Sequence, residues 1–345
     1  MKNSILIQNV YHMLAYAFQV LNKNGYKNIK TETFENTADM FAAIIQKGVE
    51  SQLKRYLNRD YVTETTILST LRGKVKITES INQMSFLNKK YVCSYDEFSI
   101  DSYMNRILKS TMLILLKADI ASERKHSLKS ILQYFSQVQE IDAHCINWKF
   151  HFNQNNQTYR MLMGICYLTL NGLLQTQSSG KTKLMDFLDE QQMCRLYEKF
   201  VLEYYRKHFP SLHPTASTMN WVAEGETQYL PTMKTDITLT DSERILIIDT
   251  KYYNRTMQNH YDKTSYHSGN ICQIFSYVKN KEGTESRKEV SGMLLYAKTD
   301  ENITPDQTFS ILGSQFSVRT LDLNVEFKEI KKQLDDIAKD KFSIP

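Results

Sequence analysis

Residues 244–253, with the sequence Arg-Ile-Leu-Ile-Ile-Asp-Thr-Lys-Tyr-Tyr, constrain the fold of this chain more than any other segment. Side chains alternate between the two faces of a strand, so the four aliphatic residues 245–248 make both faces apolar. Strands of that kind lie inside a sheet and are buried on both sides. The segment therefore predicts a central strand rather than an edge strand.

The preceding segment predicts the neighbour of that strand. Residues 229–240 are strand-like, and a turn-like Asp-Ser-Glu at residues 241–243 separates them from the central strand. Two such runs joined by a short polar turn are typical of a tight hairpin. Asp236 of the first run is then expected near the end of the second.

Charged residues end the central strand. Asp249 and Lys251 share one face, while Thr250 points to the other. Charged side chains at the end of a buried strand cost free energy unless a bound ion or another group offsets their charge. We expect a divalent metal held by Asp236, Asp249 and the main-chain carbonyl of Thr250. Mg²⁺ suits these hard oxygen ligands, with Mn²⁺ as an alternative.

Such a site predicts cleavage of phosphodiester bonds by an attacking water. Lys251 is positioned to orient or deprotonate that water and to offset the charge of a phosphorane-like transition state. The alternative is a plain ion pair between Asp249 and Lys251. The same acid-x-lysine spacing occurs at residues 326–328 and 329–331, but these lie in a charged run with helical periodicity and have no strand before them.

Predicted helices and a further strand surround the hairpin. The helix expected over residues 191–208 carries an apolar stripe made of Met193, Leu196, Tyr197, Phe200 and Tyr204. Glu198 and Glu203 flank this stripe on opposite sides, and either could reach over a strand end. A second helix over residues 270–279 and a strand over residues 290–297 follow.

The order helix, two or three strands, helix, strand resembles the core of the PD-(D/E)xK nucleases. The predicted fold class is accordingly mixed α/β, with a restriction-endonuclease-like core in the C-terminal part. Its central mixed sheet is expected to be flanked by helices. A helix-rich α+β domain is expected to precede it.

Six motifs follow one another along nearly the whole chain. They are IQNVYHMLAYA at residues 7–17, LRGKV at 71–75, DSYMNRILK at 101–109, LYEKFV at 196–201, MKTDI at 233–237 and DTKYY at 249–253. Together they resemble the McrC family, the nuclease subunit of 5-methylcytosine-specific restriction systems. The resemblance implies a DNA endonuclease that cuts only when assembled with a McrB-like AAA+ GTPase. That partner recognises the modified double-stranded DNA, and the nuclease subunit stimulates its GTP hydrolysis.

The resemblance also implies roles for individual residues. Asp236, Asp249 and Lys251 match the metal-binding and catalytic positions of the family, and Glu198 matches the acidic position of the preceding helix. Thr235 stands where the superfamily has proline, and the second acidic position is Asp rather than Glu. Neither change removes a ligand.

Two further pairs are candidates for accessory roles. Gln273 and Tyr277, four residues apart on one helix face, resemble the glutamine-tyrosine helix of RecB-like nucleases. An ordinary polar residue on an amphipathic helix is the alternative. Arg72 and Lys74, beside a turn at Gly73, are candidates for the partner contact that the family makes with its N-terminal part. The alternative is an ordinary solvated surface.

A polar run over residues 175–183 predicts the boundary between two domains. We expect a partner-interaction domain over residues 1–180 and a nuclease domain over residues 181–345. Within the first, β-rich stretches are expected at residues 62–68 and 91–98, followed by a helix capped by Asp101.

The Gly-Lys-Thr at residues 180–182 resembles the end of a P-loop. The pattern requires glycine where Gln175 stands, and a helix-like run precedes it instead of a strand. We therefore expect no nucleotide hydrolysis by this chain.

Composition is consistent with an intracellular DNA-processing protein. The 345 residues suffice for two domains, and the five scattered cysteines form no CxxC pair, so reduced thiols in the cytoplasm are expected. We expect no membrane-spanning segment and no cleaved leader. The net charge of +5 permits DNA binding but requires that basic residues gather on one face or that another subunit holds the DNA.

Two other functions stay open. One is a noncatalytic adaptor that only assembles or activates the GTPase. The other is a DNA-repair nuclease with the same core. Because two cuts need two active sites, pairing of nuclease subunits in the assembly is a further expectation.

Overall fold

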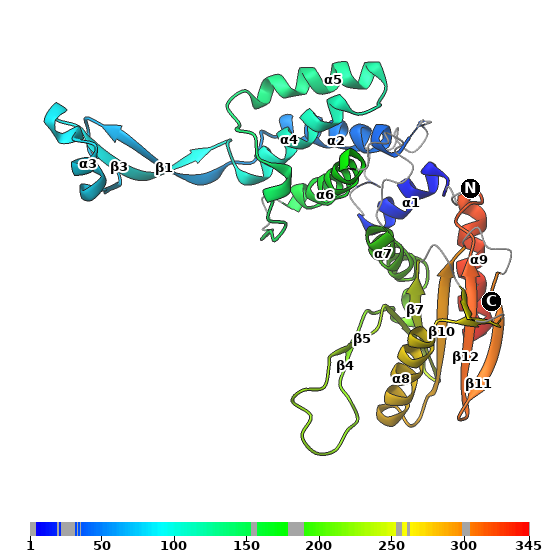
Figure 1. Ribbon diagram of the computed structural model, residues 1–345. Coiled ribbons are helices and arrows are strands. Elements are labelled where there is room, and N and C mark those ends of the chain that lie inside the picture. The colour runs from blue at the N-terminus through cyan, green and yellow to red at the C-terminus, as the bar shows by residue number, and fades with distance from the viewer. Residues whose placement is uncertain are drawn as a thin grey trace. The chain divides into compact units, whose positions relative to one another are not determined.

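The computed structural model describes residues 5–18, 21, 32, 34, 36–152, 157–178, 190–252, 257–260, 263–298 and 304–344. The chain forms two compact units (Figure 1). Residues 1–34 and 188–345 form the sheet unit, and residues 35–187 form the arm unit. The predicted division at residue 180 needs a correction, because the first 34 residues belong with the C-terminal part of the chain.

A five-stranded mixed sheet with strand order β11-β12-β10-β7-β6 forms the centre of the sheet unit. Its strands are β6 (Ile237–Thr240), β7 (Arg244–Lys251), β10 (Glu289–Ala297), β11 (Gln307–Ile311) and β12 (Ser314–Leu321). β7 runs parallel to β10 and antiparallel to β6. The predicted mixed sheet is confirmed, and β7 is a central strand because it is paired along both edges.

Helix α8 (Ser268–Thr284) covers one face of the sheet (Figure 1). Ile245 and Ile247 of β7 lie in one apolar cluster with Ile274 and Val278 of this helix. Gly292 of β10 allows α8 to pack close to the sheet, because a Cβ at this position would lie 2.8 Å from Cγ1 of Ile274. The helix predicted over residues 270–279 is confirmed and is longer than predicted.

Helices α7 (Glu190–His208) and α9 (Phe327–Phe342) belong to the opposite face. Arg244 alternates away from the α8 side of β7, and its guanidinium donates to the Lys341 carbonyl of α9 at 2.7 Å. The hydroxyl of Tyr205 on α7 donates to the Leu334 carbonyl of α9 at 3.0 Å. The predicted stripe of α7 is confirmed, since its five members are buried: Met193, Leu196, Tyr197, Phe200 and Tyr204.

The predicted hairpin is confirmed between β6 and β7, in a register that pairs Thr240 with Ile245. Asp241 makes the turn, because its Oδ1 accepts hydrogen bonds from the backbone N–H groups of Glu243 and Arg244 at 2.8 and 2.6 Å. The first predicted run is not one strand, however. It breaks at residues 235–236 into the short β5 (Met233–Lys234), which pairs with β4 (Thr218–Met219), and β6.

Helix α1 (Ile7–Ala17) explains why the N-terminal residues belong to the sheet unit. The Asn9 side-chain amide donates to the carbonyls of Leu323 and Val325 at 2.8 and 2.7 Å. The ring of Tyr16 lies 5.5 Å from that of Phe200 on α7. A helix at the start of the chain therefore completes the packing of residues more than 180 positions later.

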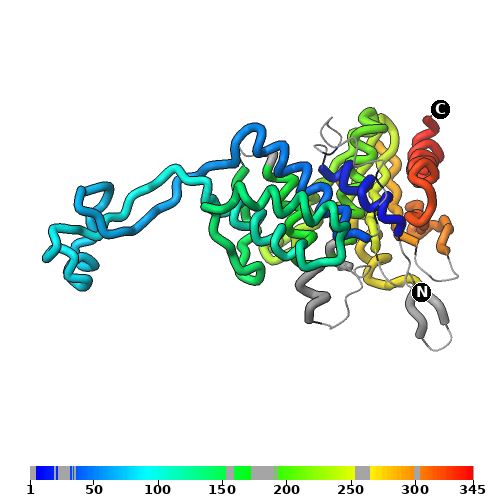
Figure 2. Tube along the Cα trace, turned by 90° about the horizontal axis from the view of Figure 1, so that it is seen from above, coloured from blue at the N-terminus to red at the C-terminus, as the bar shows by residue number. Residues whose placement is uncertain are grey.

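In the part of the arm unit that the structure describes, a long hairpin extends from a body of helices. The helices are α2 (Thr37–Leu53), α4 (Tyr103–Lys117), α5 (Ser122–Leu132) and α6 (Gln157–Ser178). The hairpin strands β1 (Asp60–Leu68) and β3 (Tyr91–Ser99) are antiparallel and extend away from these helices (Figures 1 and 2). Residues 60–99 are called the arm below. The two β-rich stretches predicted in this region are confirmed.

Short elements form the tip of the arm between its two long strands. They are β2 (Lys74–Val75), α3 (Ile77–Asn82) and η4 (Ser85–Asn88). Gly73 precedes β2 with a φ of +65°, and a Cβ there would lie 2.4 Å from the Ser94 carbonyl oxygen. Both facts require glycine at this turn.

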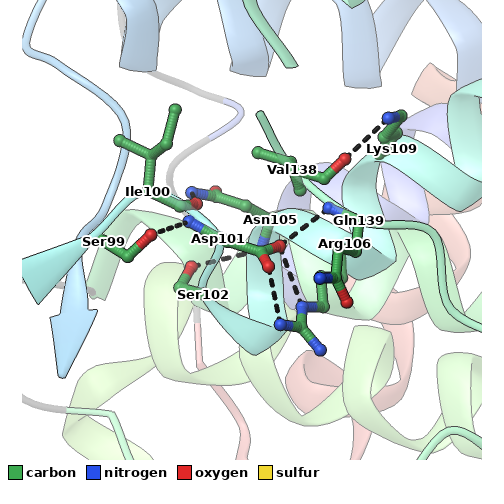
Figure 3. A network of polar contacts seen from close by, with 9 residues as sticks. All are labelled: Ser99, Ile100, Asp101, Ser102, Asn105, Arg106, Lys109, Val138 and Gln139. Atoms are coloured by element: carbon green, nitrogen blue, oxygen red, sulfur yellow. Dashed lines mark hydrogen bonds and ion pairs between the residues drawn. The ribbon is translucent and has the colours of Figure 1, made fainter. Parts of the chain in front are cut away.

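Asp101 does not cap α4, so that prediction is wrong. The N-cap is Ser102, whose hydroxyl accepts from the Asn105 backbone N–H (Figure 3). The Asp101 carboxylate instead accepts two hydrogen bonds from Arg106, at 2.9 and 2.6 Å, and one from the Gln139 backbone N–H at 2.8 Å. Asp101 therefore ties the start of α4 to the segment after α5.

The remaining short elements are η5 (Gln133–Phe135), η6 (Ala143–Cys145), η8 (Pro210–Leu212), β8 (Met257–His260) and β9 (Lys263–Tyr266). None of the helices in the described ranges is both long enough and apolar enough to cross a membrane. Residues 175–178 of the predicted boundary run are helical, and the P-loop-like residues 180–182 lie outside the described residues.

Candidate active site

Asp236 lies directly before β6 and is held by Thr250 of β7. The backbone N–H and the hydroxyl of Thr250 both donate to Oδ2 of Asp236, each at 2.8 Å. The break between β5 and β6 lets the Asp236 side chain turn toward β7. One carboxylate oxygen is thus fixed by two hydrogen bonds, and the second oxygen takes no part in them.

Lys251 is anchored by residues of β7 and α8. Its Nζ lies 2.7 Å from Oδ2 of Asp249 and donates to Oε1 of Gln273 at 3.0 Å. The Gln273 amide in turn donates to the Tyr277 hydroxyl at 2.9 Å. This last bond orients the amide so that its oxygen faces the lysine. The structure therefore places Gln273 against the ammonium, and Tyr277 behind Gln273.

Glu198, rather than Glu203, faces the predicted site. Burial raises the pKa of Glu198, and the negative charge of Asp236 raises it further. Glu203 is instead paired with Arg206, at 2.7 Å. The two positions that helical angle alone left open are therefore distinguished by the structure.

Two contacts hold α7 beside the end of β7. The Tyr197 hydroxyl contacts the Leu295 carbonyl of β10 at 3.5 Å. The Cys194 thiol contacts the Tyr252 carbonyl at 3.1 Å. Glu198 lies one residue after Tyr197, so these contacts fix the helix turn that carries it.

Asp249 is the most perturbed acid of the site, with a residue exposure of 1%. Burial raises its pKa to about 6, and the charges of Asp236 and Glu198 add to this effect while Lys251 opposes it. Oδ2 of Asp249 lies 2.7 Å from the Lys251 ammonium, which is its ion-pair partner. A carboxylate oxygen can accept a second partner in addition to the ammonium.

The donor set fits a hard divalent cation. The negative charge of Asp236 adds to the effect of burial in raising the pKa of both Asp249 and Glu198, and a cation among these carboxylates would offset their repulsion. Over the described ranges, no three His, Cys, Asp or Glu side chains are grouped tightly enough to hold a metal on their own. The site predicted from the sequence has two carboxylates, a main-chain carbonyl and waters as ligands, so it does not require three such side chains.

Some functional contacts leave no signal in the sequence. The Thr250 hydroxyl was predicted only to point away from Asp249, yet it holds Asp236. The buried Asn270 amide donates to the Tyr296 hydroxyl at 2.9 Å, and Tyr296 is the β10 neighbour of Lys251. This bond secures the first turn of α8 beside the lysine.

Arg72 and Lys74 lie on the arm. The Arg72 guanidinium is 3.1 Å from Oε2 of Glu97 and 4.0 Å from the ring centroid of Tyr95, so its charge already has local partners. Lys74 is exposed on β2. Both candidates thus belong to the arm unit, and the site described above is built from the sheet unit.

Comparison with known proteins identifies a matching family and a related protein. The family model of the McrBC 5-methylcytosine restriction system component matches residues 4–297. The chain is 28% identical over 342 residues to the type IV methyl-directed restriction enzyme EcoKMcrBC of Escherichia coli K12, covering 96% of this chain and 97% of that protein.

Two solved structures are also similar. One is the half-complex from the tetradecameric assembly of Thermococcus gammatolerans McrB AAA+ hexamers with bound McrC. It matches with a TM-score of 0.50 and 16% identity, over 96% of this chain and 76% of that chain. The other, the Thermococcus gammatolerans McrBC complex, matches with a TM-score of 0.39 and 17% identity over 72% of this chain and 63% of that chain. The first likeness shows a shared fold. Since the family model covers most of its length, this chain belongs to the McrBC family of 5-methylcytosine restriction system components.

Proposed function

We propose that this chain is the Mg²⁺-dependent DNA endonuclease subunit of a modification-dependent restriction system. The observation that carries the proposal is the meeting of Asp236, Asp249 and Lys251 at the end of β7. The similar E. coli protein is a restriction enzyme, and one similar structure holds McrB AAA+ hexamers with bound McrC. By analogy, a McrB-like GTPase in the cytoplasm is the proposed partner, and the chain stimulates its GTP hydrolysis.

Asp236, Asp249 and the Thr250 carbonyl would hold the Mg²⁺ ion, or Mn²⁺ in its place. Glu198 would support the ion directly or through a water. A bound Mg²⁺ supplies Lewis-acid stabilisation of the phosphate charge and lowers the pKa of a coordinated water. Burial is the largest cause of the raised pKa values of Asp249 and Glu198, and the negative charge of the neighbouring carboxylates adds to it. A cation would relieve this repulsion.

Lys251 is proposed to place its positive charge next to the scissile phosphate. Its two anchors, Asp249 and Gln273, limit where the ammonium can lie. A charge already held in position stabilises a transition state without first having to reorganise. Gln273 and Tyr277 are therefore positioning residues in this proposal.

The direct test combines the purified chain with a McrB-like partner, GTP, Mg²⁺ and methylated DNA. Cleavage is expected only when all components are present. Unmethylated DNA and a reaction without GTP are the controls. A chain that stimulates GTP hydrolysis but never cuts would favour the noncatalytic adaptor. Cleavage of unmodified DNA ends without the partner would favour a repair nuclease.

Thr250→Val is expected to lower kcat/KM for cleavage and the affinity for Mg²⁺ by about 10-fold, the range seen when a partner of a metal ligand is removed. Valine keeps the side-chain shape, the backbone N–H and the carbonyl but loses the hydroxyl that holds Asp236. Cleavage titrated against Mg²⁺ and calorimetric metal binding measure the two effects.

Two variants control for this substitution. Thr250→Ser keeps the hydroxyl and should retain most of the activity. Thr320→Val removes a hydroxyl on β12 that donates to the Pro305 carbonyl, and it should leave metal binding unchanged. Equal metal affinity in wild type and Thr250→Val would contradict the role given to the hydroxyl.

The arm tip is the proposed contact with the GTPase. Five apolar side chains between the two long strands of the arm are more than half exposed: Leu71, Ile77, Ile81, Met84 and Leu87. An exposed apolar cluster of this kind indicates a protein interaction site. Arg72 and Lys74 border it and would make polar contacts at its rim.

Leu87→Glu is expected to raise the concentration needed for half-maximal GTPase stimulation by about 10-fold or more, as for a central interface residue. The side chain is 68% exposed, so the substitution should leave the fold intact. Tyr134→Glu is the matched control, because Tyr134 is 64% exposed in the same unit but lies in η5, outside the arm. Equal loss in both variants would argue against a contact at the tip.

Pairing of two nuclease subunits is a further part of the proposal. Cutting both strands of a duplex needs two active sites, and the similar Thermococcus gammatolerans structure comes from a tetradecameric assembly. Mixing wild-type chain with a catalytically inactive variant tests this. When the two proteins are mixed in equal amounts, DNA cut in one strand only should accumulate if each site cuts one strand.

A further inference from the structure

The arm joins the helices of its unit at a small hydrogen-bonded network, which we call the root clamp: Asn58, Ile100, Asn105 and Tyr159. Asn58 lies just before β1, and Ile100 directly follows β3. Asn105 belongs to α4 and is 0% exposed, and Tyr159 belongs to α6 and is 1% exposed. The clamp therefore connects both ends of the arm to two different helices.

Asn105 bridges the two strands through its side chain. Its amide nitrogen donates to the Asn58 carbonyl at 2.9 Å and to the Ile100 carbonyl at 2.8 Å. Figure 3 shows the Asn105 side chain directed at the backbone of Ile100. Both amide hydrogens are thus used, one for each strand end.

Tyr159 closes the network from α6. Its hydroxyl donates to Oδ1 of Asn105 at 2.8 Å and accepts from the Asn58 backbone N–H at 2.9 Å. Burial raises the pKa of Tyr159 to about 12, so the hydroxyl stays protonated and remains a donor at neutral pH. Loss of one member would leave buried polar groups without partners, which is costly.

Beyond the clamp, the arm is held by little of the rest of its unit. Most residues of β1 are exposed, so little of this strand packs on the helical residues that the structure describes. The tip has its own order, because the Ser80 hydroxyl accepts from the Val92 backbone N–H at 2.8 Å and Ser80, Val92 and Cys93 are buried. A two-stranded ribbon is marginal by itself, so its direction depends on how its base is fixed.

We propose that the root clamp makes the arm a rigid lever, so that its direction is set before a partner binds and force at the tip passes to α4 and α6. Asn105 and Tyr159 are the positioning residues of this lever. The rigidity follows from the contacts of the arm unit alone. The use of the lever on a GTPase rests on the proposed function.

The first test measures the direction of the arm in the full chain without a partner. Spin labels at residues 84 and 129, at the arm tip and on α5, report the distance between them. They should be attached through unnatural amino acids, because Cys145 and Cys272 are exposed thiols. Wild type is expected to give one narrow distance distribution, and Tyr159→Phe a broad one.

Tyr103→Phe is the matched control. It removes another tyrosine hydroxyl of the same unit, one that accepts from the Asn147 backbone N–H at 2.8 Å and lies outside the clamp. Its distance distribution should stay narrow. Asn105→Asp, which removes both amide donors, should broaden the distribution as Tyr159→Phe does. Circular dichroism selects the variants that remain folded. A narrow distribution in folded Tyr159→Phe would overturn the rigid clamp.

The second test measures stimulation of a McrB-like GTPase by the same variants. If about a tenth of the arms keep the binding direction, the apparent affinity falls about 10-fold. A broad distance distribution with unchanged stimulation would overturn the lever while leaving the tip contact intact. Unchanged GTPase stimulation by Leu87→Glu would instead refute the proposed contact at the arm tip. The distance measurement would still test whether the root clamp fixes the direction of the arm.

Discussion

Asp249→Asn is expected to lower DNA cleavage by about 10³-fold or more while GTPase stimulation stays at the wild-type level. The substitution keeps the size of the side chain but removes the negative charge proposed to bind Mg²⁺. It also removes the charge that lies 2.7 Å from the Lys251 ammonium. Cleavage of methylated DNA and GTP turnover, measured in the same reactions with the partner present, report the two activities separately.

Glu329→Gln is the matched control for this variant. Glu329 and Lys331 have the same spacing as Asp249 and Lys251, but they lie on α9, and Glu329 is exposed. Charge loss at Glu329 should leave cleavage unchanged. Normal cleavage by Asp249→Asn would show that Asp249 and Lys251 form only a structural ion pair. Loss of GTPase stimulation in the same variant would indicate misfolding.

The local pattern of β7 was sufficient to predict its place in the sheet. Four consecutive aliphatic residues leave no polar face, and the structure pairs this strand on both sides. The break before β6 was not predictable in the same way. Thr235 favours strands, but its buried hydroxyl contacts Ser217 and Thr238, so the chain turns there. The partner Ser217 is 18 residues away, and no local pattern reveals it.

Long-range packing also explains the error in the domain boundary. The apolar pattern of α1 shows an amphipathic helix but not the surface on which it lies. Asn9 makes its hydrogen bonds to residues 323 and 325, more than 300 positions away. The arm unit is therefore inserted between α1 and α7, which a division at a single residue does not describe.

The candidate site, too, was predictable in part from local sequence, whereas the rest depends on tertiary packing. Alternation along one strand was enough to place Asp249 and Lys251 on a common face. A four-residue spacing likewise placed Gln273 and Tyr277 together, and they do hydrogen-bond. The choice between Glu198 and Glu203 needed the packing of α7, since both flank the same apolar stripe. Local periodicity thus determined the members of the site, and tertiary contacts determined which of them face it.

Metal-free wild-type protein is expected to lose stability relative to Asp249→Asn as the pH rises from about 4 to above 6. Folding raises the pKa of Asp249 from 3.8 to about 6. Between these values the folded chain keeps a proton that the unfolded chain releases, so the free energy of unfolding falls with rising pH. A shift of this size corresponds to about 2–3 kcal/mol, fully lost once the folded carboxylate ionises. Chemical denaturation of both proteins in a chelator, at several pH values, measures the difference.

Mg²⁺ should reverse this loss above pH 6 in wild type but much less in Asp249→Asn. A ligand that binds only the folded state adds stability in proportion to the logarithm of its concentration over Kd. The ionised Asp249, next to Asp236 and Glu198, is the state that destabilises the free protein and binds the cation best. If the stability curves of the two proteins run parallel from pH 4 to 8, and Mg²⁺ shifts neither, Asp249 is not the buried charge on which the proposed metal site depends.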